Sequence, residues 1–276
     1  MYFGDVSLIF RHRHPETQKN RQTAGDLLTT APPLSDEQIH HFKTYGYLIL
    51  ENLIDKATLE RWRGAIWNEL GSSLDTPDSW PIHRGGLDGY VYDPPESALV
   101  HYPPLVAIID QLGGGTFIAG DGIPIIRWPE PEQAWEMPLS GHIDAYGGRW
   151  LPFMLGATTY LYDVEPRGGA LIYWPESHHA AHRYFRKYPS HVDGSFVKDP
   201  DFTWNVFCDN PETGGREFVA NAGTVVLWHS SLTHNGSSNT RHSPRIALFA
   251  RWDNQRRDET AFRYDVPEDL WHYWAI

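Results

Sequence analysis

Three side chains of the sequence have the types and the spacing to chelate one metal ion. His142 and Asp144 are separated by a single residue, and two such residues in an extended segment point to the same face. His234 stands much further along, just beyond an apolar, β-rich run. Two imidazoles and one carboxylate on one face of a metal leave its other positions open, as in non-heme Fe(II) oxygenases. We therefore predict a metal site made by His142, Asp144 and His234.

Other histidines offer the same residue type without the same surroundings. His191 and Asp193 repeat the His-x-Asp spacing, but they run into Gly194 in a polar stretch that has no strand period. Nothing rigid would hold both side chains on one face there, so we prefer the pair His142 and Asp144. A lone histidine is more often a surface or hydrogen-bonded core residue than a ligand. This argument applies to His178, His179, His182, His229 and His242.

An arginine begins the strand that follows the turn after His234. Arg245 comes directly after Pro244, and it would be buried if this strand lines a barrel. A buried arginine needs an anion. A dicarboxylate co-substrate held by the bidentate guanidinium would satisfy it, and so would an internal carboxylate, so the residues alone leave both alternatives open. Counting by two places Arg245, Ala247, Phe249 and Arg251 on one face and Ile246, Leu248, Ala250 and Trp252 on the other.

Helical and β-rich patterns occupy different parts of the chain. Ser35 and Gln38 form a capping box that predicts a helix ending at Gly46. Two further helical patterns cover residues 55–71 and 103–112, and beyond them short β-rich runs take over. This order predicts a sandwich or barrel with helices on one face. The expected strands cover residues 47–50, 123–128, 151–164, 170–174, 218–220, 224–228 and 245–252.

Composition and charge limit the class of protein. The chain has 276 residues and a net charge of −12, which argues against a nucleic-acid or acidic-membrane partner. The lone Cys208 cannot form an internal disulfide. A short apolar run near the start precedes its basic residues, the reverse of a secretory signal peptide, and no apolar run reaches the length of a membrane span. We expect a soluble, cytoplasmic protein that is a monomer or a homodimer.

The motifs and their order resemble the phytanoyl-CoA dioxygenase (PhyH) family of Fe(II)/2-oxoglutarate oxygenases. Residues 34–50 resemble the family's opening helix and strand, and His142-Ile-Asp144 falls at its first two ligands. Residues 168–178 resemble its Gly-x-Leu…Pro-Gly-Ser-His turn, with Glu176 where glycine is usual. The distal-histidine strand and the 2-oxoglutarate arginine are matched by residues 223–229, His234, Asn239 and Arg245.

The resemblance implies a mainly β fold with flanking helices around a double-stranded β-helix (jelly-roll, cupin-like) core. We expect residues 1–32 to form an N-terminal arm, flexible or acting as a lid, and residues 33–276 to form a single oxygenase domain. That domain would comprise a helical leader at 33–115, the jelly-roll core at 123–252 and a C-terminal segment at 253–276.

The resemblance also implies the cofactors. Fe(II) would bind the three predicted ligands, and 2-oxoglutarate would chelate the iron and place its far carboxylate on Arg245. With O2 as the second co-substrate, the expected reaction is hydroxylation with release of succinate and CO2. Gly236 stands where a hydroxyl often helps to bind 2-oxoglutarate, so Ser237 or Tyr160 is the expected substitute. Asp144 as the carboxylate ligand argues against halogenation.

The substrate is predicted from the residues around these motifs. The run Ile123–Trp128 brings Arg127 and Trp128 near the first metal ligands, while Trp80 and Trp135 lie in long irregular segments where lids are common. A thioester of coenzyme A would need a basic entrance, and these segments offer no Lys/Arg cluster. We expect a small or medium-sized, largely apolar metabolite, such as a secondary metabolite. The predicted substrate residues are Arg127, Trp135, Phe249 and Arg251.

Two other classes of protein remain as alternatives. A metal-dependent hydrolase can use the same ligand types, but it needs a general base and has no use for Arg245. A jelly-roll binding protein that has lost catalysis would be expected to have lost a ligand or the arginine. The sequence retains all four residues.

Overall fold

The computed structural model describes residues 33–82, 99–146, 154–208, 214–255 and 266–276. The predicted N-terminal arm therefore lies outside the described residues. The helices of the first part are α1 (Asp36–Tyr45), α2 (Lys56–Leu70), a 3-10 helix η1 (Pro77–Ser79) and α3 (Pro103–Gly113). The strands are β1 (Tyr47–Leu50), β2 (Phe117–Arg127), β3 (Met154–Tyr160), β4 (Leu171–Tyr173), β5 (Arg216–Glu217), β6 (Val225–His229), β7 (His234–Gly236) and β8 (Arg245–Asn254).

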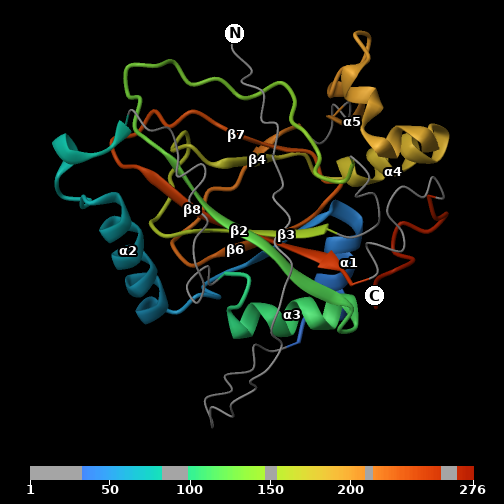
Figure 1. The fold of residues 1–276 in the computed structure, drawn as a ribbon, viewed down its shortest axis with the longest axis horizontal. Helices are drawn as coiled ribbons and strands as arrows, with labels where there is room; N and C mark the ends of the chain where they lie inside the picture. The colour runs from blue at the N-terminus through green and yellow to red at the C-terminus, as the bar shows by residue number, and fades with distance from the viewer. Residues whose placement is uncertain (1–32, 83–98, 147–153, 209–213, 256–265) are drawn as a thin grey trace, which may run out of the picture.

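These strands form two antiparallel sheets. The larger sheet has the order β1-β6-β3-β8-β2, and the smaller one has the order β5-β4-β7. In Figure 1, β4 and β7 lie to one side of the larger sheet and α3 lies to the other. The prediction of a mainly β jelly roll with flanking helices is confirmed.

The capping residues of the first helix behave as predicted. The Ser35 hydroxyl accepts a hydrogen bond from the Gln38 amide (3.2 Å), and the Gln38 side chain accepts one from the Ser35 amide (2.9 Å). Gly46 then ends α1 at a φ of 79°, in the left-handed region that favours glycine. The chain passes directly into β1, at the edge of the larger sheet.

Two hydrophobic clusters lie on the two faces of the larger sheet: an inner cluster between the two sheets, and a helix-side cluster on the face that the helices cover. Alternate residues of β8 divide between them as the period of two predicted. Ala247 and Phe249 face the inner cluster, whereas Ile246, Leu248, Ala250 and Trp252 belong to the helix-side cluster. The inner cluster lies between the two sheets and contains Tyr47, Tyr160, Val164, Ala170, Leu171, Tyr173, Phe218, Val226, Trp228, Leu232 and Ala247.

Several strand boundaries differ from the prediction. β2 already begins at Phe117, and a register shift between Ala119 and Gly122 hides the strand period in that part of the sequence. The strand expected at 218–220 is wrong, because β5 is formed by Arg216–Glu217 and only an isolated bridge joins Ala220 to Val164. The smaller sheet is therefore built from shorter strands than the apolar runs indicated.

A helical insertion between β4 and β5 was not predicted. It consists of α4 (Ser177–Lys187), two 3-10 helices (Pro189–Asp193 and Ser195–Lys198) and α5 (Asn205–Cys208). Its rings pack on one another; Phe185 and Phe196, for example, have centroids 5.6 Å apart, and both belong to the helix-side cluster. The spacing of the buried Ala181 and Phe185 is helical, but the polar and histidine-rich start of the segment concealed this pattern.

Two tryptophans expected near the metal ligands lie elsewhere. Trp128 belongs to the helix-side cluster and packs on Trp67 and Trp80, with centroid distances of 6.4 and 5.7 Å. The lid role suggested for Trp80 is therefore not supported. The C-terminal residues Trp271 and Trp274 are also buried in this cluster, against α1 and α3. Among the described residues, the helices are too short or too polar to cross a membrane.

Candidate metal centre

Backbone hydrogen bonds bring the three predicted ligands together. His142 and His234 exchange two amide–carbonyl bonds of 2.9 Å, and the Asp144 amide donates to the Ser230 carbonyl at 3.0 Å. The segment with His142 and Asp144 is thus fixed to both ends of the turn that leads into β7. A methyl group at Gly141 would overlap the His234 carbonyl, so this close approach requires glycine.

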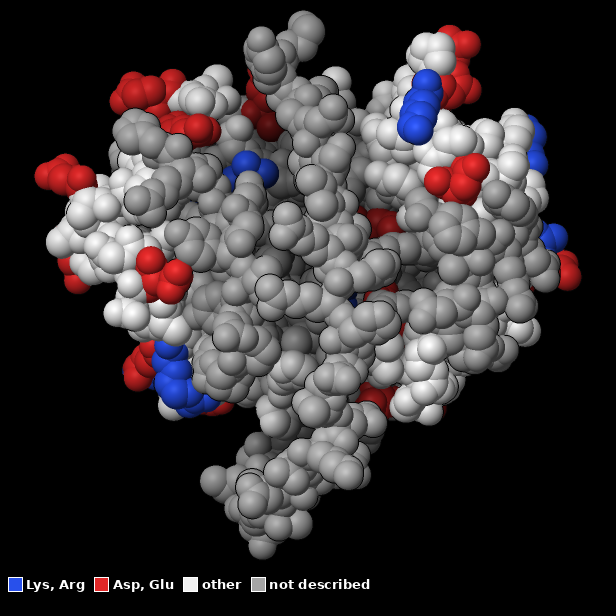
Figure 2. Space-filling model, in the orientation of Figure 1, with Lys and Arg blue, Asp and Glu red and all other residues white. Residues whose placement is uncertain are grey.

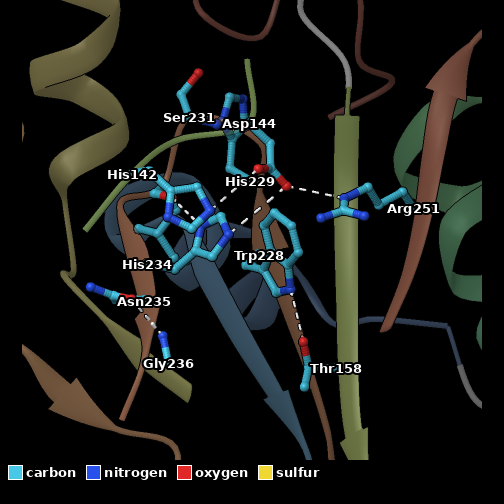
Figure 3. Close-up of polar contacts among 11 residues, drawn as sticks. His142, Asp144, Thr158, Trp228, His229, Ser231, His234, Asn235, Gly236 and Arg251 are labelled. Carbon is cyan, nitrogen blue, oxygen red and sulfur yellow. Dashed lines mark hydrogen bonds and ion pairs between the residues drawn. The ribbon is translucent and has the colours of Figure 1, made fainter. Parts of the chain in front are cut away.

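The three side chains converge on one point (Figure 3). One ligand atom from each of His142, Asp144 and His234 lies within 4.8 Å of the others. His142 Nε2 is 3.7 Å from Asp144 Oδ1, and His234 Nε2 is 3.9 Å from Asp144 Oδ2. Their side-chain exposures are 48%, 14% and 6% for His142, Asp144 and His234, so the cluster is open on the His142 side. Two histidines and one carboxylate suit a divalent transition metal with open positions.

His234 is held in the tautomer that a metal ligand needs. Its Nδ1 lies 2.9 Å from the Leu232 carbonyl, and donation there leaves Nε2 unprotonated and directed toward Asp144. Burial and the neighbouring His142 lower the pKa of His234 to about 4, so the imidazole is neutral near pH 7. On its other side, the buried Trp228 packs with a centroid distance of 4.5 Å.

Asp144 carries a full negative charge at the centre of the cluster. Burial alone would raise the pKa of its carboxyl, but Arg251 and the two histidines together lower it to about 2. Arg251 Nε donates to Asp144 Oδ2 at 3.0 Å. Arg251, which was predicted to contact substrate, thus binds the carboxylate of Asp144, the candidate ligand. Asp144 Oδ1 has no hydrogen-bond donor among the described residues.

Arg245 is buried without a carboxylate partner. It is 4% exposed, and it donates from Nε to the Gly169 carbonyl (2.6 Å) and from Nη1 to the Ile125 carbonyl (3.1 Å). None of the ion pairs between described residues includes it, so the internal salt bridge considered from sequence is not seen there. Burial lowers the pKa of Arg245 to about 10, which leaves it charged near pH 7.

The hydroxyl groups of Tyr160 and Ser237, expected to help bind 2-oxoglutarate, differ in whether they can donate a hydrogen bond to it. Tyr160 is fully buried, its ring lies 5.9 Å from the Arg245 guanidinium carbon, and its hydroxyl accepts from the Leu171 amide at 2.8 Å. The hydrogen of that hydroxyl remains available to an acceptor. Ser237 instead donates its hydroxyl hydrogen to the Ala170 carbonyl at 2.9 Å. Because a carboxylate only accepts hydrogen bonds, Tyr160 suits 2-oxoglutarate better than Ser237 does.

The three remaining predicted residues, Arg127, Phe249 and Trp135, lie on different parts of the chain's fold. Arg127 ends β2 directly opposite Arg245, and Phe249 lies on the face of β8 that packs on the inner cluster. Trp135 packs beside the Arg167 guanidinium, 5.8 Å from its carbon, at the turn where Arg167 and Thr240 are hydrogen-bonded. The structure does not bring Trp135 together with the metal ligands.

Most of the other candidate histidines have hydrogen-bond partners, and His242 is exposed. His178, His179 and His182 lie within hydrogen-bond distance of the carbonyls of Lys43, Thr44 and Pro267, respectively, while His229 accepts from the Ser231 amide. His191 Nδ1 lies 2.7 Å from the Tyr184 hydroxyl, and Asp193 accepts from the Ser195 amide, so this His-x-Asp is part of a turn. Within the described ranges, the cluster of His142, Asp144 and His234 is the one group found that fits a metal ion.

Sequence reasoning missed the residues that support His234. Trp228 donates from Nε1 to the Thr158 hydroxyl at 3.2 Å, and its indole fills the space above Gly156. Tyr146, two residues after Asp144, was missed as well; its ring packs on Phe196 at 5.4 Å. A glycine inside a β-rich run often marks the close approach of another group, so Gly156 could have been recognised.

A Gly156→Ala variant tests this support. The added methyl group would overlap the indole of Trp228, which would have to move toward His234. We expect a loss of about 1–3 kcal/mol in the free energy of unfolding, as for other overpacked cores, together with weaker metal binding. Urea unfolding and a Co(II) titration measure the two effects.

Gly64 in α2 provides the matched control, because a Cβ there meets nothing within 4 Å. Gly64→Ala should be neutral or stabilising by up to about 1 kcal/mol, since alanine favours the helix. Equal behaviour of the two variants would show that Trp228 does not depend on Gly156.

The fold and the site together define a jelly-roll protein with two histidines and one carboxylate that could hold a metal ion. The family model of phytanoyl-CoA dioxygenase (PhyH) matches residues 42–247, which is most of the chain. The chain belongs to this family and is an Fe(II)/2-oxoglutarate-dependent oxygenase. Among curated proteins, no sequence matches it.

Solved structures with the same fold include several oxygenases. SnoK, a non-heme alpha-ketoglutarate-dependent carbocyclase from nogalamycin biosynthesis, is 20% identical with a TM-score of 0.54, over 82% of this chain and 86% of SnoK. EctD from S. alaskensis, solved with 2-oxoglutarate and 5-hydroxyectoine, is 16% identical with a TM-score of 0.56, over 84% and 79% of the two chains. HygX from Streptomyces hygroscopicus, solved with nickel and 2-oxoglutarate, is 17% identical with a TM-score of 0.50, over 81% and 88%. At these identities the likeness shows a shared fold.

Proposed function

We propose that His142, Asp144 and His234 hold Fe(II) and that the protein hydroxylates a small or medium-sized, largely apolar metabolite. The observation that carries the proposal is the convergence of these three side chains in a family of oxygenases. With 2-oxoglutarate and O2 bound, the iron supplies the oxidation of a substrate C–H bond, with release of succinate and CO2.

The protein's own residues bind and orient the reactants. Arg251 occupies Asp144 Oδ2, which leaves Oδ1 to the metal and favours binding through a single oxygen. The Leu232 carbonyl and the Trp228 indole fix the ring of His234. The buried Arg245 has the charge and the free donors to take the far carboxylate of 2-oxoglutarate. A hydrolase would have no use for this arginine.

Tyr146, an aromatic side chain beside Asp144, supports an apolar substrate. Tyr146 packs on Phe196 and Trp204, with centroid distances of 5.4 and 5.9 Å. Burial and the charge of Asp144 raise the pKa of Tyr146, so its phenol stays protonated and can orient a substrate. Phe249 faces the same interior as Arg251, on β8. The partly buried rings of Tyr146 and Phe249 suit a flat or polycyclic molecule.

The surface charge does not favour an acyl-CoA. The net charge is −12, and Figure 2 shows no continuous basic patch among the described residues of that face. The phosphates of coenzyme A would require such a patch at the entrance. SnoK, a structure with the same fold, is a carbocyclase from nogalamycin biosynthesis.

A substrate screen tests the proposed function. The protein is loaded with Fe(II) and 2-oxoglutarate, and succinate is measured with aromatic or polycyclic metabolites and with acyl-CoAs. We expect the first group to stimulate succinate formation and to yield a product that has gained one oxygen atom. Omission of Fe(II) should abolish both signals. Salt-sensitive stimulation by an acyl-CoA alone would overturn the substrate class, and succinate-independent hydrolysis would overturn the reaction.

A further inference from the structure

Arg127 lies in a space that two glycines leave open. A Cβ at Gly236 would be 2.8 Å from Nη2 of Arg127, and a Cβ at Gly169 would be 3.0 Å from its Cβ. Gly236 is two residues beyond the ligand His234 on β7, so the Arg127 guanidinium lies close to the strand that carries this ligand. A serine or threonine at residue 236 would compete with Arg127 for the same space.

Arg127 and Arg245 meet at Gly169. They are directly opposite one another on β2 and β8, and Arg245 donates to the Gly169 carbonyl at 2.6 Å while Arg127 packs against the same glycine. Arg245 is buried, whereas Arg127 is exposed. The pair therefore has an inner and an outer guanidinium on one side of the barrel.

The two cations have no counter-charge in the described part of the chain. The ion pairs found there include neither Arg127 nor Arg245. Like charges directly opposite on neighbouring strands destabilise a sheet. After burial, the charge of Arg127 contributes to the lowered pKa of Arg245. An anion held between the two guanidinium groups would remove this repulsion.

We propose that Arg127 is a second cationic contact for the remote carboxylate of 2-oxoglutarate, beside Arg245. The inference rests on the proposed function and deepens it, because it assigns Arg127 to the co-substrate and not to the organic substrate. It also accounts for glycine at residue 236, where the guanidinium takes the place of a side chain.

The test compares two oxo acids that differ only at the remote end. 2-Oxovalerate has the five-carbon chain of 2-oxoglutarate but ends in a methyl group. Calorimetric titration of the nickel-loaded protein measures the affinity for each acid without turnover. We expect Arg127→Leu to weaken 2-oxoglutarate about tenfold or more, as for the loss of a hydrogen bond to a charged group, and to leave 2-oxovalerate unchanged. Arg127→Lys should give an intermediate loss, because it keeps the charge without the fork.

Arg241→Leu is the matched control. Arg241 lies on the neighbouring turn, where its Nε is 3.7 Å from Glu165, and both side chains are largely exposed. The variant removes the same charge, and we expect it to change neither affinity. Thermal unfolding of each variant checks that the fold is retained.

The outcomes separate this inference from the function on which it rests. If Arg127→Leu keeps full 2-oxoglutarate affinity while Arg245→Leu loses it, Arg127 is not a co-substrate contact. If Arg127→Leu weakens both acids equally, its effect is on the metal or the fold, and the inference is again overturned. If the unaltered protein shows no preference for 2-oxoglutarate over 2-oxovalerate, the proposed co-substrate itself is wrong.

Discussion

An Asp144→Ala variant should lose all 2-oxoglutarate-dependent oxidation. The carboxylate lies between the two histidines and supplies the single negative charge of the cluster. Loss of a partner outside the ligand shell typically costs about 10–100-fold in metal affinity, so the loss of a ligand should reduce Fe(II) affinity by more than about 100-fold. Metal titration and succinate formation measure the two effects.

Two further variants make this result specific. Asp144→Asn keeps an oxygen for the hydrogen bond from Arg251 and separates metal binding from local packing. His191→Ala removes the histidine of the competing His-x-Asp, whose ring is hydrogen-bonded to Tyr184. We expect His191→Ala to leave metal binding and oxidation intact. Equal losses in Asp144→Ala and His191→Ala would show that the metal site has been assigned to the wrong pair.

An Arg245→Ala variant should bind 2-oxoglutarate far more weakly. Truncation of one partner of a buried charge pair costs about 2–5 kcal/mol. The variant also loses the bonds to the Gly169 and Ile125 carbonyls, so its stability must be measured alongside. Arg245→Lys keeps the charge and loses the bidentate fork, and it should show a smaller loss of affinity while the fold survives.

The measurement is the dependence of succinate formation on 2-oxoglutarate concentration, with Arg241→Ala as the control for an exposed arginine. An unchanged dependence in a folded Arg245→Ala variant would remove this arginine from the site. If Arg245→Ala does not fold, the 2-oxoglutarate dependence is compared between Arg245→Lys and the unaltered protein, because the lysine can still reach one of the two carbonyls.

The sequence predicted the features that depend on local spacing. His142 and Asp144 share a face because one residue separates them, and the period of two correctly divided β8 between the inner and the helix-side clusters. The capping box of α1 was correct for the same reason, since Ser35 and Gln38 act within one turn. Each of these predictions needs only the neighbours of a residue along the chain.

Features that depend on distant partners were not predicted. Arg251 was expected to contact substrate, because nothing in β8 shows that Asp144 lies beside it. Trp128 was placed near the metal, although α2 supplies Trp67 as its neighbour on the other face. The insertion after β4 was not predicted, because the partners of its aromatic residues, such as Phe196 for Phe185, come from other segments of the insertion.

The backbone bridge between His142 and His234 would couple metal binding at the proposed site to folding. It joins two segments that are distant in the sequence, so the cluster is complete only after the chain between them has folded. An ion that binds this cluster stabilises the folded state over the unfolded one, and the unfolding midpoint should rise with metal concentration. Local opening that separates β7 from the segment with His142 would release the metal while most of the larger sheet stays paired.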